Sequence, residues 1–154
     1  MLAPLRNAHF PDVARDVAEA IARLTFVGGF DAVIDVNVIA GKERPGADFS
    51  TPVVFVIPIP GEPPSLDDDD VQTACRVQVL VRGTPRNLDL CERTCREAMA
   101  GLHLRRDVPA TETQTGKPSV YMDLRVLDAA PVFLGENRNE ADRCAFSLVC
   151  LYAD

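Results

Sequence analysis

Two cysteines one helical turn apart are the first residues in this chain that could do chemistry. Cys91 and Cys95 have i,i+4 spacing, so two thiolates on one helix face could bind a metal ion such as zinc. The same positions fall in an apolar stripe with Leu88, Met99 and Leu102, which is typical of a helix that packs on a core. Cysteine is among the most often buried residues, so we interpret both as core side chains. The sequence therefore predicts no resident metal and no cofactor.

Four adjacent carboxylates form the second candidate site. Asp67, Asp68, Asp69 and Asp70 could hold a hard cation such as calcium, but they lack the spaced ligands and turn glycine of an EF-hand loop. A solvated acidic loop is the simpler interpretation. Prolines before the run cannot continue a central strand, because each lacks an amide donor. We expect residues 59–71 to form a protruding loop whose aspartates are candidates for contact with a partner.

Other catalytic patterns are weak. The two histidines, His9 and His103, do not have the spacing of metal ligands. Gly28-Gly29 lacks the lysine of a P-loop and the spacing of a dinucleotide fingerprint. No serine lies in a nucleophile elbow. None of these patterns marks a catalytic site.

Length, composition and charge limit the kinds of protein that this chain can be. The chain has 154 residues, of which 47% are hydrophobic, enough for one domain with a core. Its net charge of −7 argues against a protein that binds nucleic acid through phosphates. The same charge suits solubility and also suits a surface that repels a polyanion. The five cysteines are scattered, which favours free thiols in a reducing compartment. No apolar run approaches the ~20 residues that span a bilayer, so no membrane contact is expected.

A strand, a tight turn and a helix at residues 74–102 form the unit that organises the rest. Valines alternate with polar residues before Gly83, which predicts a half-buried strand. Asn87 can cap the following helix, which carries the apolar stripe to Leu102. The buried face of the strand would carry Cys75, Val77, Val79 and Val81.

Flanking segments complete the predicted secondary structure. A helix is expected over residues 11–25, since Val13, Val17 and Ile21 recur at helical spacing before a glycine pair. Its opposite side would carry Arg15, Asp16, Glu19 and Arg23. Apolar patterns predict strands at 33–39, 53–57, 120–127 and 143–152. The last two are expected to form an antiparallel pair with an elaborated connection.

Two motifs, in this order, resemble a family of phage tail proteins. Val77–Gly83 reads V-Q-V-L-V-R-G and opens the central strand. Pro131–Gly135 reads P-V-F-L-G and precedes a last strand that begins near Arg143. The chain thereby resembles the bacteriophage minor capsid or tail-terminator family of siphophage-like tails, from the first helix to Tyr152.

The resemblance implies a small α/β (α+β) domain, a mixed, mostly antiparallel sheet with two helices packed on one face. Family members assemble as a ring, usually six-fold, that caps the tail tube and joins it to the head–tail connector. That function needs no catalytic residue, so the resemblance implies a protein that is not an enzyme. DNA passes through the ring without tight binding. The implied partners are further copies of the chain, the tail tube protein and the connector protein. The implied place is the tail–head junction of the virion, after assembly in the host cytoplasm.

Two alternatives stay open. A head-completion or neck protein would contact the portal instead of the tube. A small α/β enzyme would carry an unrecognised site. A single domain over residues 1–154 is expected in every case. In a ring, a lumen that carries carboxylates would not retain DNA, and Asp67–Asp70 would face the lumen or a basic partner.

Overall fold

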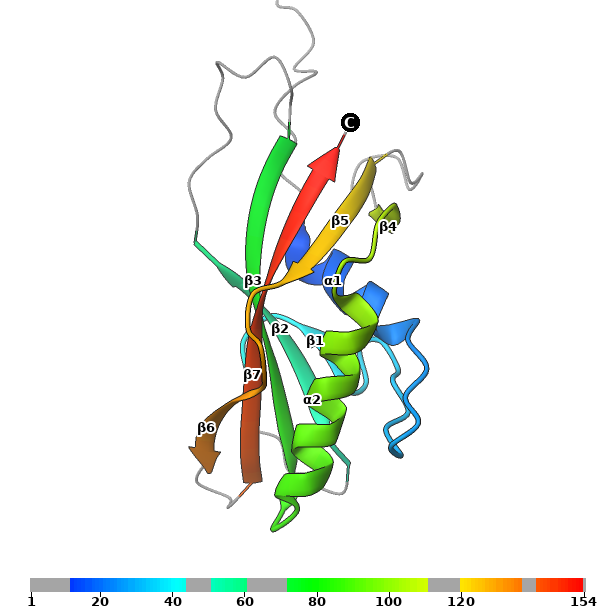
Figure 1. The fold of residues 1–154 in the computed structure, drawn as a ribbon. Coiled ribbons are helices and arrows are strands. Elements are labelled where there is room, and N and C mark those ends of the chain that lie inside the picture. Colours follow the sequence, from blue (N-terminus) through cyan, green and yellow to red (C-terminus); the bar gives the residue numbers. More distant parts are fainter. Residues whose placement is uncertain (1–11, 44–50, 61–71, 111–119, 137–140, 154) are drawn as a thin grey trace, which may run out of the picture.

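The structure is a computed structural model that describes residues 12–43, 51–60, 72–110, 120–136 and 141–153. The elements are α1 (Val13–Ala22), β1 (Val38–Ala40), β2 (Val53–Ile59), β3 (Gln72–Pro85), α2 (Leu88–Leu102), β4 (Val108–Ala110), β5 (Val120–Val126), β6 (Val132–Glu136) and β7 (Ala141–Ala153). Both helices pack against one side of a single curled sheet (Figure 1). The expected α+β fold is confirmed. Within the described ranges, no helix is long and apolar enough to cross a membrane.

The sheet is mixed and mostly antiparallel. Its strand order is β1-β2-β3-β7-β5-β4, with β6 paired to β7 outside this path. Only β1 and β2 run parallel among the described pairs. Leu148 of β7 pairs with Val126 of β5, and Ala145 of β7 pairs with Val132 of β6. The strands β5 and β6 therefore follow one another along the edge of β7 that faces away from β3.

The helix α2 has the bounds that its sequence predicts. Asn87 caps it, because its side-chain oxygen accepts a hydrogen bond from the amide of Leu90 at 3.1 Å. Cys91, Cys95 and Leu102 are fully buried, and Met99 packs half-buried against the same core. The expected burial of Leu88 is wrong, since this residue is 39% exposed. It is the first helical residue, and the contact of Cys91 with β3 comes one turn later.

The helix α1 is shorter than expected. Asp12 caps it, and the helix ends at Ala22 instead of residue 25. Leu24 then turns toward α2, where a Cβ added to Gly101 would lie 2.8 Å from its Cδ1 atom. The segment after the helix therefore lies close to α2. Val17 and Ile21 of the predicted stripe are fully buried.

The strand predicted at 33–39 is mostly a turn, and only Val38–Ala40 forms β1. Asp35 has a φ of 64°, which no strand allows. The side-chain oxygen of Asn37 accepts the amide hydrogen of Val33 at 2.6 Å. The side chain of Asn37 thus accepts the hydrogen bond that a neighbouring strand would accept in a sheet. The alternation of apolar and polar residues in the sequence does not reveal such a bond.

The strand β2 runs through Pro58 to Ile59, although a proline was expected to end it. The amide of Val54 points to β1, where it donates to the carbonyl of Asn37 at 2.8 Å. Pro58 has the same parity, so its nitrogen lies on that side too. The pairing with β1 ends at Val56, so the proline costs no ladder bond there. The strands β4 and β6 were not predicted.

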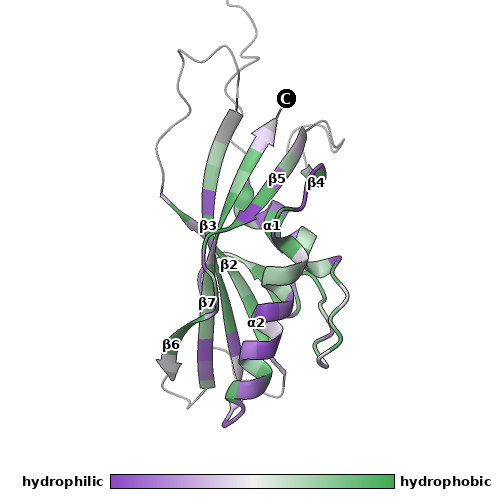
Figure 2. Ribbon diagram, viewed as in Figure 1, coloured by the Kyte–Doolittle hydropathy of each residue, from purple (hydrophilic) through white to green (hydrophobic). Residues whose placement is uncertain are grey.

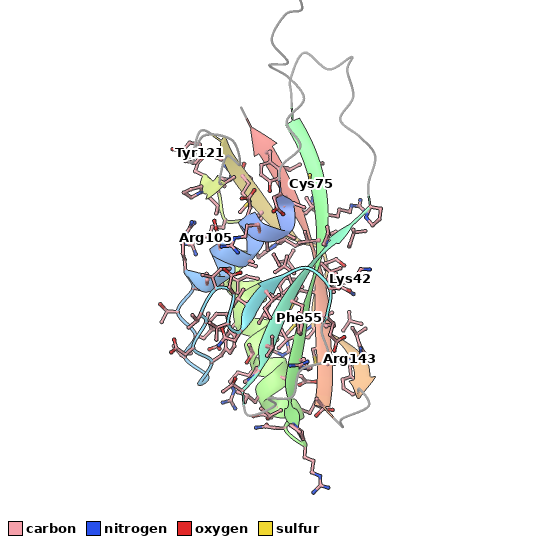
Figure 3. The ribbon with its side chains drawn as sticks, turned by 180° about the vertical axis from the view of Figure 1, so that it is seen from behind. Lys42, Phe55, Cys75, Arg105, Tyr121 and Arg143 are labelled. Atoms are coloured by element: carbon pink, nitrogen blue, oxygen red, sulfur yellow. The ribbon has the colours of Figure 1, made fainter. Side chains whose placement is uncertain are left out.

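The sheet buries apolar side chains on both faces. The main core lies between the helices and the sheet, and the exposed side of α2 is strongly hydrophilic (Figure 2). A smaller cluster on the opposite face contains Val53, Phe55, Leu80 and Ala145. There the guanidinium carbon of Arg82 lies 5.4 Å from the centre of the Phe55 ring. Phe55 and Arg143 are seen on this side of the sheet in Figure 3.

Candidate interaction site

The cysteines of α2 belong to the core, as expected. The thiol of Cys91 donates to the carbonyl oxygens of Val81 at 3.3 Å and Asp142 at 3.5 Å. Burial raises the pKa of Cys95 to about 12 and also raises the pKa of Cys91. Both are therefore protonated near neutral pH, which disfavours metal binding. In the described part of the chain, no three His, Cys, Asp or Glu side chains could hold a metal ion.

Two of the sequence-based candidates lie outside the described residues. These are His9 and the aspartate run Asp67–Asp70. His103 follows the last residue of α2, and its Nδ1 accepts the amide hydrogen of Val126 at 3.2 Å. The imidazole proton is then on Nε2. His103 therefore ties the end of α2 to the end of β5.

A buried polar pair joins the first helix to the last strand, and the sequence pattern misassigned one member. Asp16 was expected on the outer side of α1 but is 1% exposed. The hydroxyl of Tyr152 donates to its Oδ2 at 2.9 Å. Burial raises the pKa of Tyr152, and the charge of Asp16 adds to the shift. One signal in the sequence could have indicated this pair. Tyr152 falls on the apolar side of the predicted last strand, and a buried tyrosine hydroxyl needs a hydrogen-bond partner.

A groove lies between the second half of α2 and the link from β5 to β6. Its volume is about 370 Å³. The Oδ2 of Asp128 accepts the amide hydrogen of Ser147 at 2.6 Å, which holds the link on β7. The groove is therefore bounded by two anchored segments. Its lining residues are Arg96, Met99, Ala100, His103, Val126, Asp128, Ala129, Ala130 and Pro131.

The strand β6 is an apolar edge next to this link. Val132, Phe133 and Leu134 are 45%, 52% and 38% exposed. Phe133 pairs with Cys144, so its side chain lies on the helix-bearing face of the sheet. Among the described strands, β6 has only β7 as a neighbour. An exposed apolar edge strand is a template for binding another chain.

The loop between α1 and β1 is a third exposed apolar surface. It projects from the side of the molecule that carries α1 (Figure 1). Val27 is 90% exposed and Val36 is 69% exposed. The Oε1 of Glu97 accepts the amide hydrogens of Val27 and Gly28, each at 3.0 Å. The amides beside the glycine pair are thus directed at a carboxylate of α2.

No protein-family model matches the chain, and no curated protein sequence matches it either. The arrangement itself is suited to protein–protein contact. Three apolar surfaces are held on anchored backbone: the groove, β6 and the loop at 27–36. We therefore consider assembly as the function.

Proposed function

We propose that this chain is a structural virion protein of the tail-terminator type. It forms a ring that caps the tail tube and joins the tube to the head–tail connector, and DNA passes through the ring. The proposal needs no catalytic residue and no cofactor. Its partners are further copies of the chain, the tube protein and the connector protein.

The observation that carries the proposal is the exposure of β6. The motif Pro131–Gly135, which supports the resemblance to tail terminators, lies in and beside this edge strand. Phe133 is the most exposed of its three large apolar residues, at 52%. An exposed aromatic side chain on a free edge is typical of a surface that another protein covers.

The charge of the chain is compatible with this role. A net charge of −7 disfavours retention of DNA on a surface that DNA must pass. Weak attraction is an advantage in a channel, since each phosphate contact slows transit. The charge thus fits a ring through which DNA moves without tight binding.

Native mass spectrometry and cryo-electron microscopy of the purified full chain test the ring. We expect a closed ring with a central opening, and the same ring at the tail–head junction of virions. A chain that stays monomeric at all concentrations and never enters virions would contradict the proposal. A monomer stabilised by a small ligand would favour the enzyme instead.

A matched pair of variants tests the contribution of β6. Phe133→Asp should leave the chain folded but reduce the fraction of tail tubes that carry a ring, because a charge replaces the apolar contact. Tyr121→Asp is the control, since Tyr121 is similarly exposed, at 48%, on β5 of the same sheet. Equal capping of tubes by both variants would remove β6 from the proposed interface.

A further inference from the structure

We propose that copies of this chain associate head-to-tail, with the loop at residues 27–36 of one copy seated in the α2 groove of the next. This inference rests on the proposed ring and specifies the contact that builds it. The loop supplies three exposed valines, Val27, Val33 and Val36, and the exposed acidic residue Asp31. The groove supplies an apolar floor and the exposed cation of Arg96, and the carboxylate of Asp128 in its lining accepts the amide hydrogen of Ser147.

The loop presents its valines on a preorganised backbone. Asn37 closes the turn at both ends, because its Oδ1 accepts from the Val33 amide and its Nδ2 donates to the carbonyl of Asp31, each at 2.6 Å. Arg15 of α1 bonds the carboxylate of Asp35 at 2.7 Å. Val36 is 69% exposed on this tied turn. A surface that is already ordered loses little entropy on docking, so it is suited to insertion into a partner.

The groove offers the loop apolar contacts and one exposed cation. Met99, Ala100 and Val126 are among its apolar lining residues, and its volume of about 370 Å³ accommodates side chains of a tight turn. Arg96 lines the groove and is exposed. Asp31 is exposed on the loop. A valine in the groove and Asp31 near Arg96 would combine apolar burial with an ion pair that fixes orientation.

The loop lies outside the groove of its own chain, since none of its residues lines that groove. Glu97 of α2 holds the loop through the amides of Val27 and Gly28. The groove uses a different side of the same helix, where Met99 and His103 lie. Two complementary surfaces at different places on one molecule make a heterologous contact, which closes into a ring when the rotation between copies is right. A second copy is therefore the occupant that the geometry favours.

Two complementary variants test this contact. Val36→Asp disables the loop and leaves the groove intact, whereas Ala100→Glu disables the groove and leaves the loop intact. Each variant alone should be monomeric in native mass spectrometry. An equimolar mixture should form a heterodimer that does not grow, because it retains one intact loop and one intact groove. Leu88→Glu, at the other end of α2, is the control and should assemble as the unchanged chain does.

The outcomes separate this inference from the proposed function. If both variants form the same ring as the unchanged chain, the ring stands and the loop–groove contact is wrong. If the unchanged chain never associates, both proposals are wrong. If the variants are monomeric but their mixture is also monomeric, the contact is not head-to-tail. Circular dichroism of each variant should match that of the unchanged chain. A variant that unfolds is replaced by Asp31→Ala for the loop or Arg96→Ala for the groove, whose mixture has the same expected result.

Discussion

Tyr152 donates its hydroxyl hydrogen to the carboxylate of Asp16 at 2.9 Å, which joins the last strand to the first helix inside the core. Their exposed fractions are 2% and 1%. A buried carboxylate is costly unless it is hydrogen-bonded, so this contact helps to determine where α1 lies on the sheet. Burial raises the pKa of Tyr152, which keeps the donor protonated at physiological pH.

The first prediction concerns this contact. Tyr152→Phe removes one donor from a buried carboxylate and should lower the free energy of unfolding by about 1–3 kcal/mol. Tyr121→Phe removes the hydroxyl of an exposed tyrosine and should change it by less than about 0.5 kcal/mol. Urea denaturation of the two variants measures the difference. Equal losses would show that the hydroxyl of Tyr152 does not stabilise the fold.

The second prediction concerns pH. Burial raises the pKa of Cys95 from 9.0 to about 12, so the folded chain keeps a proton that the unfolded chain loses above pH 9.0. The stability that the buried Cys95 thiol contributes is thus fully present below pH 9.0. It is lost as the pH rises toward the pKa of this thiol in the folded chain, about 12. Each such thiol contributes a slope of about 1.4 kcal/mol per pH unit in this window. In urea titrations under reducing conditions, Cys95→Ala should show a shallower alkaline decline. An unchanged slope would contradict the assignment.

The third prediction concerns the close approach of β3 and α2. A Cβ at Gly83 would lie 2.8 Å from the Cβ of Cys91, which is held by the helix backbone. Gly83→Ala should therefore destabilise the fold by about 1–3 kcal/mol through overpacking. Gly28→Ala is the matched control, because its nearest atom is the flexible Cδ of Arg93 at 2.5 Å. Thermal denaturation should show the larger fall in melting temperature for Gly83→Ala, and the reverse order would contradict the packing.

The fourth prediction compares two leucines near the end of α2. Leu102 is fully buried, and Leu102→Ala should cost about 2–5 kcal/mol because it leaves a cavity. Leu104 is 66% exposed, and Leu104→Ala should change the free energy of unfolding by less than about 0.5 kcal/mol. Chemical denaturation distinguishes them. Similar losses would place Leu104 in the core.

The fifth prediction concerns the aspartate run, which lies outside the described residues. Under the proposed function, replacing Asp67–Asp70 by asparagine should leave the fold intact, since these residues are expected in a solvated loop. The same change should impair virion assembly or DNA passage, because it removes charge from the lumen or from a partner contact. Phage titre measures the effect. A normal titre would remove the run from the proposed interface.

Local sequence patterns were sufficient to predict a helix or strand where residue periodicity and capping residues indicate the same element. Valine alternation predicted the strand before Gly83, and the Asn87 N-cap predicted α2, which has the predicted bounds. The turn expected at Gly83 is wrong, since β3 continues to Pro85. The prediction was wrong where a side chain, instead of the backbone of a neighbouring strand, accepts a backbone hydrogen bond. At Asn37 an asparagine side chain closes a turn inside an alternating run, so the predicted strand shrank to Val38–Ala40.

Sequence by itself determined which residues could form the main core, because burial of an amphipathic helix or strand depends on spacing within about two turns. It indicated Val77, Val79 and Val81 as buried, and all three are fully buried. Only the tertiary structure decided which polar residues enter the core and which apolar residues stay outside. Asp16 is buried because Tyr152 reaches it from the far end of the chain. Val36 and Phe133 are exposed because the loop turns outward and β6 has β7 alone as its described neighbour. Such contacts join residues far apart in sequence, and no local period encodes them.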